Sequence, residues 1–166
     1  MQRTNFDHLS CSVARTMNII GEWWTPLILR DIFSGIHRFD VLRRHLGISR
    51  KVLTNRLNTL VENEIVERVL YQENPDRYEY RLTERGRDLF PVIVALMTWG
   101  DKWIFGAQEP PVQLVDRETN NVIQPLLISA DTGQEIRYEN VRMRLGSPAY
   151  KEEWQRLQNA IAESNS

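Results

Sequence analysis

One short segment carries the polar side chains that proteins use to read nucleic acids. Lys51, Thr54, Asn55 and Asn58 recur at i, i+3, i+4 and i+7, so a helix would carry them on one side, with Arg50 beside them. Arg and Lys pair with guanine edges or phosphates, and Asn pairs with adenine. Such a polar side is most often only solvated. Here it holds no large apolar residue, and the elements around it favour contact with a DNA major groove.

The neighbouring residues predict two helices in tandem. Leu53, Leu57 and Leu60 lie opposite the polar side and give that helix a buried stripe. Residues 38–46 form a shorter amphipathic helix, and a tight turn leads from it to Ser49, the expected N-cap of the next helix. This order is typical of a helix-turn-helix, whose second helix enters the major groove.

Two strand-like runs follow the tandem helices. Residues 66–71 and 78–82 flank a turn around Pro75, and the second run alternates with a period of two. We therefore predict a winged helix-turn-helix, mainly α with a β-hairpin wing. Arg77 at the wing tip would enter a minor groove or rest on the backbone, although the acidic residues beside it would repel phosphate.

Further basic residues border the polar helix. Arg38, Arg43 and Arg44 flank the first helix of the pair and are expected to touch phosphates, which position a protein without reading sequence. Surface solubility is the plainer interpretation of these three. Ser49 and Arg56 are expected to serve as a cap and as a phosphate or salt-bridge partner, respectively.

Charge, length and cysteine content bound the class of protein. The net charge of the 166 residues is −1, but seven Lys and Arg stand against two Asp within 30–56, and local charge sets a nucleic-acid footprint. The single Cys excludes a disulfide within the chain and favours a cytoplasmic setting. The sequence shows no signal-like segment and no long apolar run, so we expect a cytoplasmic protein without membrane contact.

Three further helices are expected outside the extension. The first covers about 12–23, and the second begins at Thr25 and Pro26, a fair N-cap and a good first helical residue. A long helix over about 84–105 follows the wing, and Pro91 should kink or split it. We expect residues 1–106 to form one winged-helix domain for DNA binding and dimerisation.

The last part of the chain, 107–166, is predicted to be a C-terminal extension. It begins with a linker over 107–111 and ends in a helix that starts at Ser147 and Pro148. Between them lie four short β-like runs: 112–115, 122–128, 136–138 and 141–145. The extension is therefore expected to be small and β-rich, with a terminal helix.

Cys11 is a possible redox sensor. It lies just before the first expected helix and near Arg15, and a thiol at a helix N-terminus is often more reactive than usual. A sensor would form a bridge between subunits or an adduct with a small thiol, whereas a structural residue would only pack at a dimer contact. His8, His37 and His45 lack the spacing of metal ligands.

Two aromatic groups need a partner. One comprises Trp23, Trp24, Trp99 and Trp103. The other is a stripe on the terminal helix, made of Tyr150, Trp154, Leu157 and Ile161. The tryptophans line an effector pocket or, more simply, pack in the core or at a dimer contact. The stripe is expected to be buried either within the extension or against a partner subunit, and the sequence is compatible with both.

Matches along most of the first hundred residues carry a family resemblance. They are Cys11–Arg15, Ile20–Gly21, Trp24–Thr25, Leu27–Asp31, Arg38–Phe39, Leu53, Arg56–Leu57, Leu60, Ile65–Arg68, Tyr80–Gly86 and Trp99–Gly100. In this order they resemble the HxlR-type winged-helix transcriptional regulators, which are related to the MarR regulators. The resemblance implies a cytoplasmic homodimer that binds a roughly two-fold symmetric operator in double-stranded DNA. It also implies a dimer contact through the N-terminal segment and the long helix after the wing.

The extension resembles one that some family members carry, in which cysteines form a zinc ribbon. The corresponding positions here hold Ser or Thr, including Ser129 and Thr132. Hydroxyls are poor replacements for zinc-binding thiolates. We therefore expect no metal and no other cofactor.

The sequence supports three classes of function to different degrees. The leading interpretation is a sequence-specific DNA-binding transcriptional regulator, a homodimeric repressor on family grounds, whose operator affinity a small effector, an electrophile or modification of Cys11 would change. The alternative is a winged helix used for protein–protein contact with no DNA role. An enzyme is disfavoured because the sequence contains none of the nucleophile-elbow, zinc-protease or phosphate-loop motifs.

Overall fold

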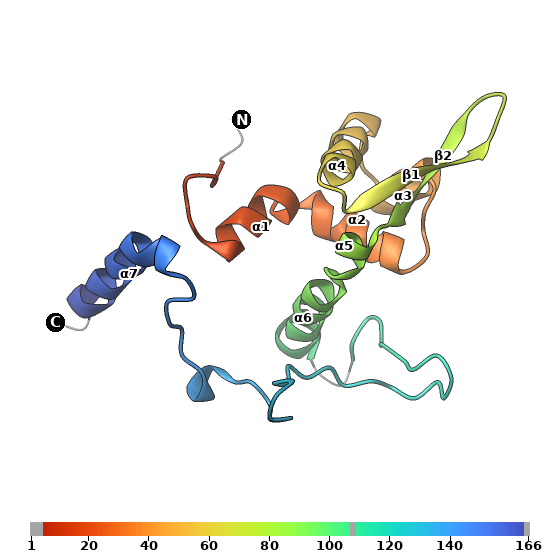
Figure 1. Cartoon of the computed structure of the whole chain (residues 1–166). Coiled ribbons are helices and arrows are strands. Elements are labelled where there is room, and N and C mark those ends of the chain that lie inside the picture. The colour runs from red at the N-terminus through yellow and green to blue at the C-terminus, as the bar shows by residue number, and fades with distance from the viewer. Residues whose placement is uncertain (1–4, 107–108, 165–166) are drawn as a thin grey trace.

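Four helices and a hairpin build the N-terminal part of the molecule. The computed structural model describes residues 5–106 and 109–164. Its elements in chain order are α1 (Ser12–Ile20), α2 (Trp24–Phe33), α3 (Phe39–Leu46), α4 (Arg50–Glu62), β1 (Val66–Gln72), β2 (Arg77–Leu82), α5 (Glu84–Arg87), α6 (Phe90–Gly100), the π-helical η1 (Asp101–Gly106), the 3-10 turns η2 (Tyr138–Asn140) and η3 (Pro148–Tyr150), and α7 (Lys151–Ser164) (Figure 1). The helix-turn-helix and the wing are confirmed.

The core lies under α4, as the leucine spacing predicts. Leu53, Leu57 and Leu60 have no exposed surface, and they pack with Leu42 of α3 and Ile28 of α2 in one apolar cluster. Burying each such side chain contributes about 1.5–3 kcal/mol. Burial of these three leucines fixes the rotation of α4 about its axis, and so the direction that its polar side faces.

The turn between α3 and α4 sets the angle of the second helix. Gly47 ends α3 with φ of +66°, a left-handed conformation that costs an L side chain about 1 kcal/mol or more. Ser49 then caps α4, because its side-chain oxygen accepts the N–H of Val52 at 3.3 Å. The predicted cap is confirmed.

The wing is an antiparallel hairpin joined to the helix pair at its base. Val66 of β1 stands opposite Leu82 of β2, so that the buried end of the hairpin meets the core. The segment before α3 adds a short third edge, since the Tyr80 N–H donates to the His37 carbonyl at 2.8 Å. Arg38, the N-cap of α3, places its guanidinium 4.5 Å from the Tyr71 ring centroid, which adds a contact between α3 and the wing.

The first two helices begin and end differently from the prediction. α1 ends at Ile20 instead of residue 23, with Gly21 as its C-cap. The N-cap of α2 is Trp23 instead of Thr25. Thr25 is buried, and its N–H donates to the Glu22 carbonyl at 2.8 Å. Packing against the core therefore overrides the local capping preference of Thr.

Pro91 divides the region after the wing, as predicted. Thr83 caps the short α5 by accepting the N–H of Gly86 at 3.0 Å, and Pro91 lies in the first turn of α6, where a missing N–H costs nothing.

By length and composition alone, the stretch Glu84–Gly106 is apolar enough to cross a membrane, with mean hydropathy 1.2. Only 11% of its most apolar window is buried within the chain.

The extension departs from its β-rich prediction. Among residues 109–164 the structure has no named strand, only two isolated antiparallel bridges, Val115 to Val122 and Ile128 to Glu135. Within the described residues, the β-like runs have no neighbouring strand with which to extend these bridges. The helix expected at Ser147 is present as η3 followed by α7, while residues 107–108 of the predicted linker lie outside the described part of the chain.

Candidate nucleic-acid interface

The outer side of α4 offers polar groups that nothing within the subunit occupies. Lys51, Asn55 and Asn58 are exposed, and Thr54 is partly buried beside them. The structure gives the side chains of these four no hydrogen bond or ion pair with any other described residue. Their donors and acceptors are therefore available to the edges of bases.

Two arginines on the same helix have different surroundings. Arg50 is 75% exposed, lies 3.8 Å from the Asp40 carboxylate and stacks 5.2 Å from the centroid of Phe39. Arg56 is only 20% exposed and pairs with Glu22 at 3.2 Å. Arg56 therefore has the predicted salt-bridge role, whereas Arg50 keeps its guanidinium at the surface.

The three arginines around α3 also differ in exposure. Arg38 is exposed but stacked on the wing, and Arg44 is exposed. Arg43 is partly buried, and its Nε has no hydrogen-bond partner among the described residues. Arg44 is thus the most open of the three toward a phosphate.

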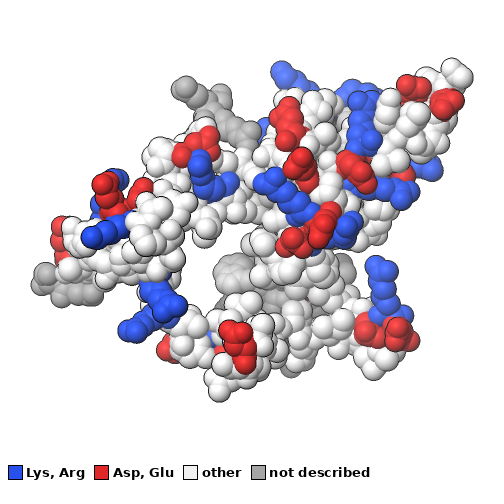
Figure 2. All heavy atoms as spheres, viewed as in Figure 1, with Lys and Arg blue, Asp and Glu red and all other residues white. Residues whose placement is uncertain are grey.

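The wing tip is polar and of mixed charge. Arg77 is exposed at the start of β2, and the Tyr78 hydroxyl donates to Asp76 at 3.3 Å. Arg68 lies 3.5 Å from the centroid of the Tyr78 ring and stiffens the hairpin. Figure 2 shows Lys and Arg interspersed with Asp and Glu over α4 and the wing, so no uniform basic surface covers this view.

A buried carboxylate supports the helix pair, and the sequence reasoning missed it. The Asp31 side chain is 2% exposed and accepts hydrogen bonds from Arg30, at 2.9 and 2.6 Å, on the same helix. Its other oxygen lies 2.7 Å from His45 Nδ1 at the end of α3. An Asp among apolar neighbours in a helix was the available signal. The contact fixes α3 against α2 immediately before the turn into α4.

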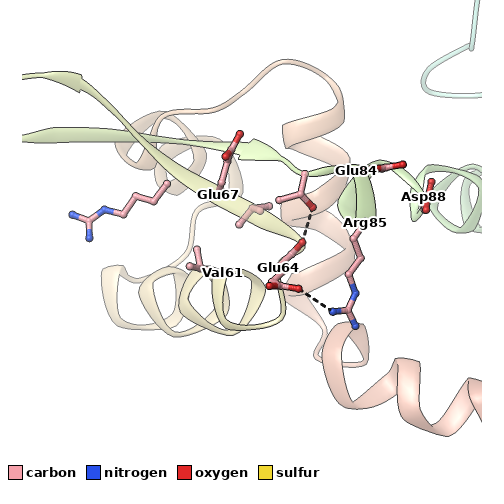
Figure 3. Close-up of a pocket in the computed structure, with 9 residues that line it drawn as sticks. Val61, Glu64, Glu67, Glu84, Arg85 and Asp88 are labelled. Atoms are coloured by element: carbon pink, nitrogen blue, oxygen red, sulfur yellow. Dashed lines mark hydrogen bonds and ion pairs between the residues drawn. The ribbon is translucent and has the colours of Figure 1, made fainter.

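An open depression lies beside the wing, between α4, β1 and α5. Four of its lining residues are acidic: Glu64, Glu67, Glu84 and Asp88 (Figure 3). Arg85 approaches Glu64 at 3.8 Å across its floor. The four carboxylates outnumber the two arginines of the lining, Arg68 and Arg85, so the depression is unfavourable for phosphates.

Cys11 is exposed and occupies the N-cap of α1 without a side-chain capping bond. The segment before it is held by Asp7, which pairs with Arg15 at 2.7 Å. The side-chain hydrogen bond from Asn5, followed by the charge of Arg15, lowers the pKa of Asp7 below its ordinary value. The guanidinium of Arg15 is therefore paired with Asp7.

The tryptophans do not belong to the core of the subunit. Trp23 is 90% exposed, and Trp99 and Trp103 are 60% and 65% exposed. None of them lines the depression beside the wing. Of the three predicted roles, packing in the core of the subunit is excluded for Trp23, Trp99 and Trp103.

Within residues 109–164, a carboxylate and a hydroxyl each close a turn by accepting backbone N–H groups. Asp116 Oδ1 accepts from the N–H groups of Glu118 and Thr119, at 3.1 and 2.8 Å, and Ser129 Oγ accepts from Thr132 N–H at 3.4 Å. The Thr119 N–H bond leads the causes that lower the pKa of Asp116. Within the described residues, no three His, Cys, Asp or Glu side chains gather as metal ligands.

The comparisons with known proteins agree with this geometry. The HxlR-like helix-turn-helix family matches residues 19–108. An uncharacterized HTH-type transcriptional regulator of Mycobacterium tuberculosis is 46% identical over 140 residues, which cover 84% of this chain and 88% of the relative. The crystal structure of PA1607, a candidate transcription factor, superposes with a TM-score of 0.75 at 36% identity, over 85% of this chain and 99% of that one. The redox regulator HypR in its oxidized form matches with a TM-score of 0.51 at 35% identity, over 55% of this chain and 95% of that one.

Proposed function

Because this chain belongs to the HxlR-like helix-turn-helix family, we propose that it is a homodimeric repressor that binds a specific operator in double-stranded DNA. At the coarser level it is a transcriptional regulator with a helix-turn-helix, and its relatives are regulators, not enzymes. Repression is proposed on family grounds. The protein would act in the cytoplasm, where the operator lies.

The outer side of α4 carries the proposal. Its exposed Lys51, Asn55 and Asn58 stand on a helix whose other side is fully buried. Direct readout needs both properties, since base recognition depends on donors held in a fixed direction. Arg50, Arg44 and the wing residue Arg77 would add contacts to phosphates.

A dimer is supported by exposed apolar surface on the elements expected to form it. Val13 of α1 is 69% exposed, and Leu96 and Trp99 of α6 are 56% and 60% exposed. Pairing two chains through these helices would present two α4 helices to one duplex. They would enter successive major grooves about 34 Å apart.

Regulation is proposed to act on the spacing of the two α4 helices. Cys11 is exposed at the start of α1, within the expected dimer contact. The related HypR is a redox regulator whose oxidized form is known. Modification of Cys11 by an oxidant or electrophile, or binding of a small effector, would shift the dimer and change operator affinity.

The test is a gel-shift titration of operator DNA selected from random sequences. Lys51→Ala and Asn55→Ala should each weaken binding by about 1–3 kcal/mol, or about 5- to 150-fold, without changing the thermal midpoint. Arg117→Ala, an exposed charge change in the extension, is the control and should leave binding unchanged. If neither α4 variant affects binding, the assignment is wrong.

The competing protein–protein module predicts a different outcome in the same assay. A regulator releases counterions on binding, so its affinity should fall steeply between about 50 and 200 mM salt. If the chain binds none of the DNA selected from random sequences even at low salt, the protein–protein function is favoured instead.

A further inference from the structure

The extension has no core of its own. Of its described residues, 109–164, none is buried. Large apolar side chains along it are widely exposed: Leu126 64%, Leu127 67%, Tyr138 92% and Met143 76%. In α7, Leu157 and Ile161 on the apolar stripe are 39% and 44% exposed. The apolar side chains that would form a core for this segment are therefore exposed to solvent.

The extension also makes little contact with the rest of its own chain. Near the start of α7, the Glu153 carboxylate accepts a hydrogen bond at 2.8 Å from the hydroxyl of Ser10, which lies in the segment before α1. The extension's other side-chain hydrogen bonds stay within it, as in the Asp116 and Ser129 turns. Figures 1 and 2 show an open gap between α7, the body and α6.

The total exposed area is larger than that of a compact chain of the same mass. The chain exposes 13464 Å². A compact protein of 19.6 kDa exposes about 8,600 Å², so the excess is about 4,900 Å². Obligate dimers bury about 2,000–5,000 Å² in total, half of it on each chain. The excess therefore exceeds what a simple flat dimer contact would remove from one subunit.

A matching apolar surface is present on the same chain. Trp103, Ile104 and Phe105 of η1 are 65%, 67% and 59% exposed, and Leu96 and Trp99 of α6 continue the same apolar surface. The extension begins directly after this helix but does not cover it. In a two-fold pair, each extension would reach the α6 and η1 surface of the other chain.

We infer that residues 109–164 form an arm that closes over α6 and η1 of a second copy of this chain, so that two subunits exchange arms. The inference rests on the homodimer of the proposed function and extends it. A lipid surface fits less well, because the irregular backbone of 109–147 would leave unpaired polar groups in hydrocarbon.

The first test measures dimer dissociation of the full-length chain by sedimentation. Leu127→Asp should weaken dimerisation at least 10-fold, while Gln134→Asp, an exposed change of equal charge in the same segment, should have less than a 2-fold effect. Because Leu127 is 67% exposed, its replacement should leave the thermal unfolding of the winged domain unchanged. An unchanged dissociation constant would overturn the exchanged arm while leaving the dimer in place.

A second test distinguishes exchange from folding back. In a Cys11→Ser background, Leu127→Cys and Trp103→Cys are combined and treated with a short bifunctional thiol reagent. Arm exchange predicts a covalent dimer, and a cross-link confined to one chain would overturn it.

Two further outcomes would contradict the arm. They are a monomeric wild-type chain and flotation of the chain with phospholipid vesicles in place of dimerisation. Neither readout involves DNA, so failure of the Lys51 gel shift would refute the proposed function without affecting the arm.

Discussion

Replacing Gly86 by Ala is expected to destabilise the wing. An added Cβ would lie 2.0 Å from the Ile65 carbonyl oxygen and 3.1 Å from Leu82 Cδ2. Carbon–oxygen contacts normally stand at about 3.3 Å or more, so α5 and β1 would have to separate by more than about 1 Å. The obstructing atom belongs to the backbone, which a rotamer change cannot move.

The cost follows from what that separation breaks. Thr83 donates its N–H to Ile65 at 3.2 Å and its hydroxyl to the Glu64 carbonyl at 2.5 Å. Overpacking costs about 1–3 kcal/mol, and weakening a buried backbone bond adds about 1 kcal/mol. We expect the free energy of unfolding to fall by about 2–4 kcal/mol, which lowers the melting temperature by on the order of 10 °C.

Thermal unfolding followed by circular dichroism measures this effect. Gly100→Ala is the matched control, since an added Cβ at this helical glycine meets nothing within 4 Å. Its melting temperature should match or slightly exceed that of the wild type, because Ala favours helix over Gly by up to about 1 kcal/mol. A Gly86→Ala protein that melts within about 2 °C of the wild type would refute the steric argument.

Three other predictions concern charge and metal. Asp31→Asn removes the charge from a buried carboxylate that binds Arg30 and His45, so the free energy of unfolding in urea should fall by about 1–3 kcal/mol; an unchanged midpoint would contradict this. The folded-state pKa of Asp116 is lowered, so its stabilising effect is complete above about pH 4 and is lost as the pH falls through the lowered value. Hydrogen exchange of the Thr119 amide should therefore accelerate there, and a rate independent of this titration would be evidence against the turn. Because the extension has no cysteine and hydroxyls are poor zinc ligands, a chelator should leave the melting temperature unchanged, and a fall of several degrees would indicate a bound metal.

The helix-turn-helix could be predicted because its determinants are local. The spacing of Leu53, Leu57 and Leu60 defines one buried side of a helix, and Ser49 and Thr83 act on N–H groups within their own helices. Pro91 acts through its own backbone. Each of these features depends on neighbours in sequence, so a pattern of residue types is enough to locate it.

Other features depend on contacts that the sequence does not place. His45 meets Asp31 across 14 positions, and Arg56 meets Glu22 only once α4 packs against the α1–α2 turn. In the extension, short β-like runs predicted strands, but a strand needs a neighbour, and Val115 and Ile128 form only single bridges. The DNA contacts and the dimer remain predictions.

The ion pair between Glu22 and Arg56 joins the turn after α1 to the middle of α4. α1 is a rod of nine residues, about 14 Å long, with a thiol at one end and Glu22 just beyond the other. In the proposed regulator, a modification of Cys11 that tilts this rod would act on Arg56 in the middle of α4. Such a response would need no ligand cavity near the bases.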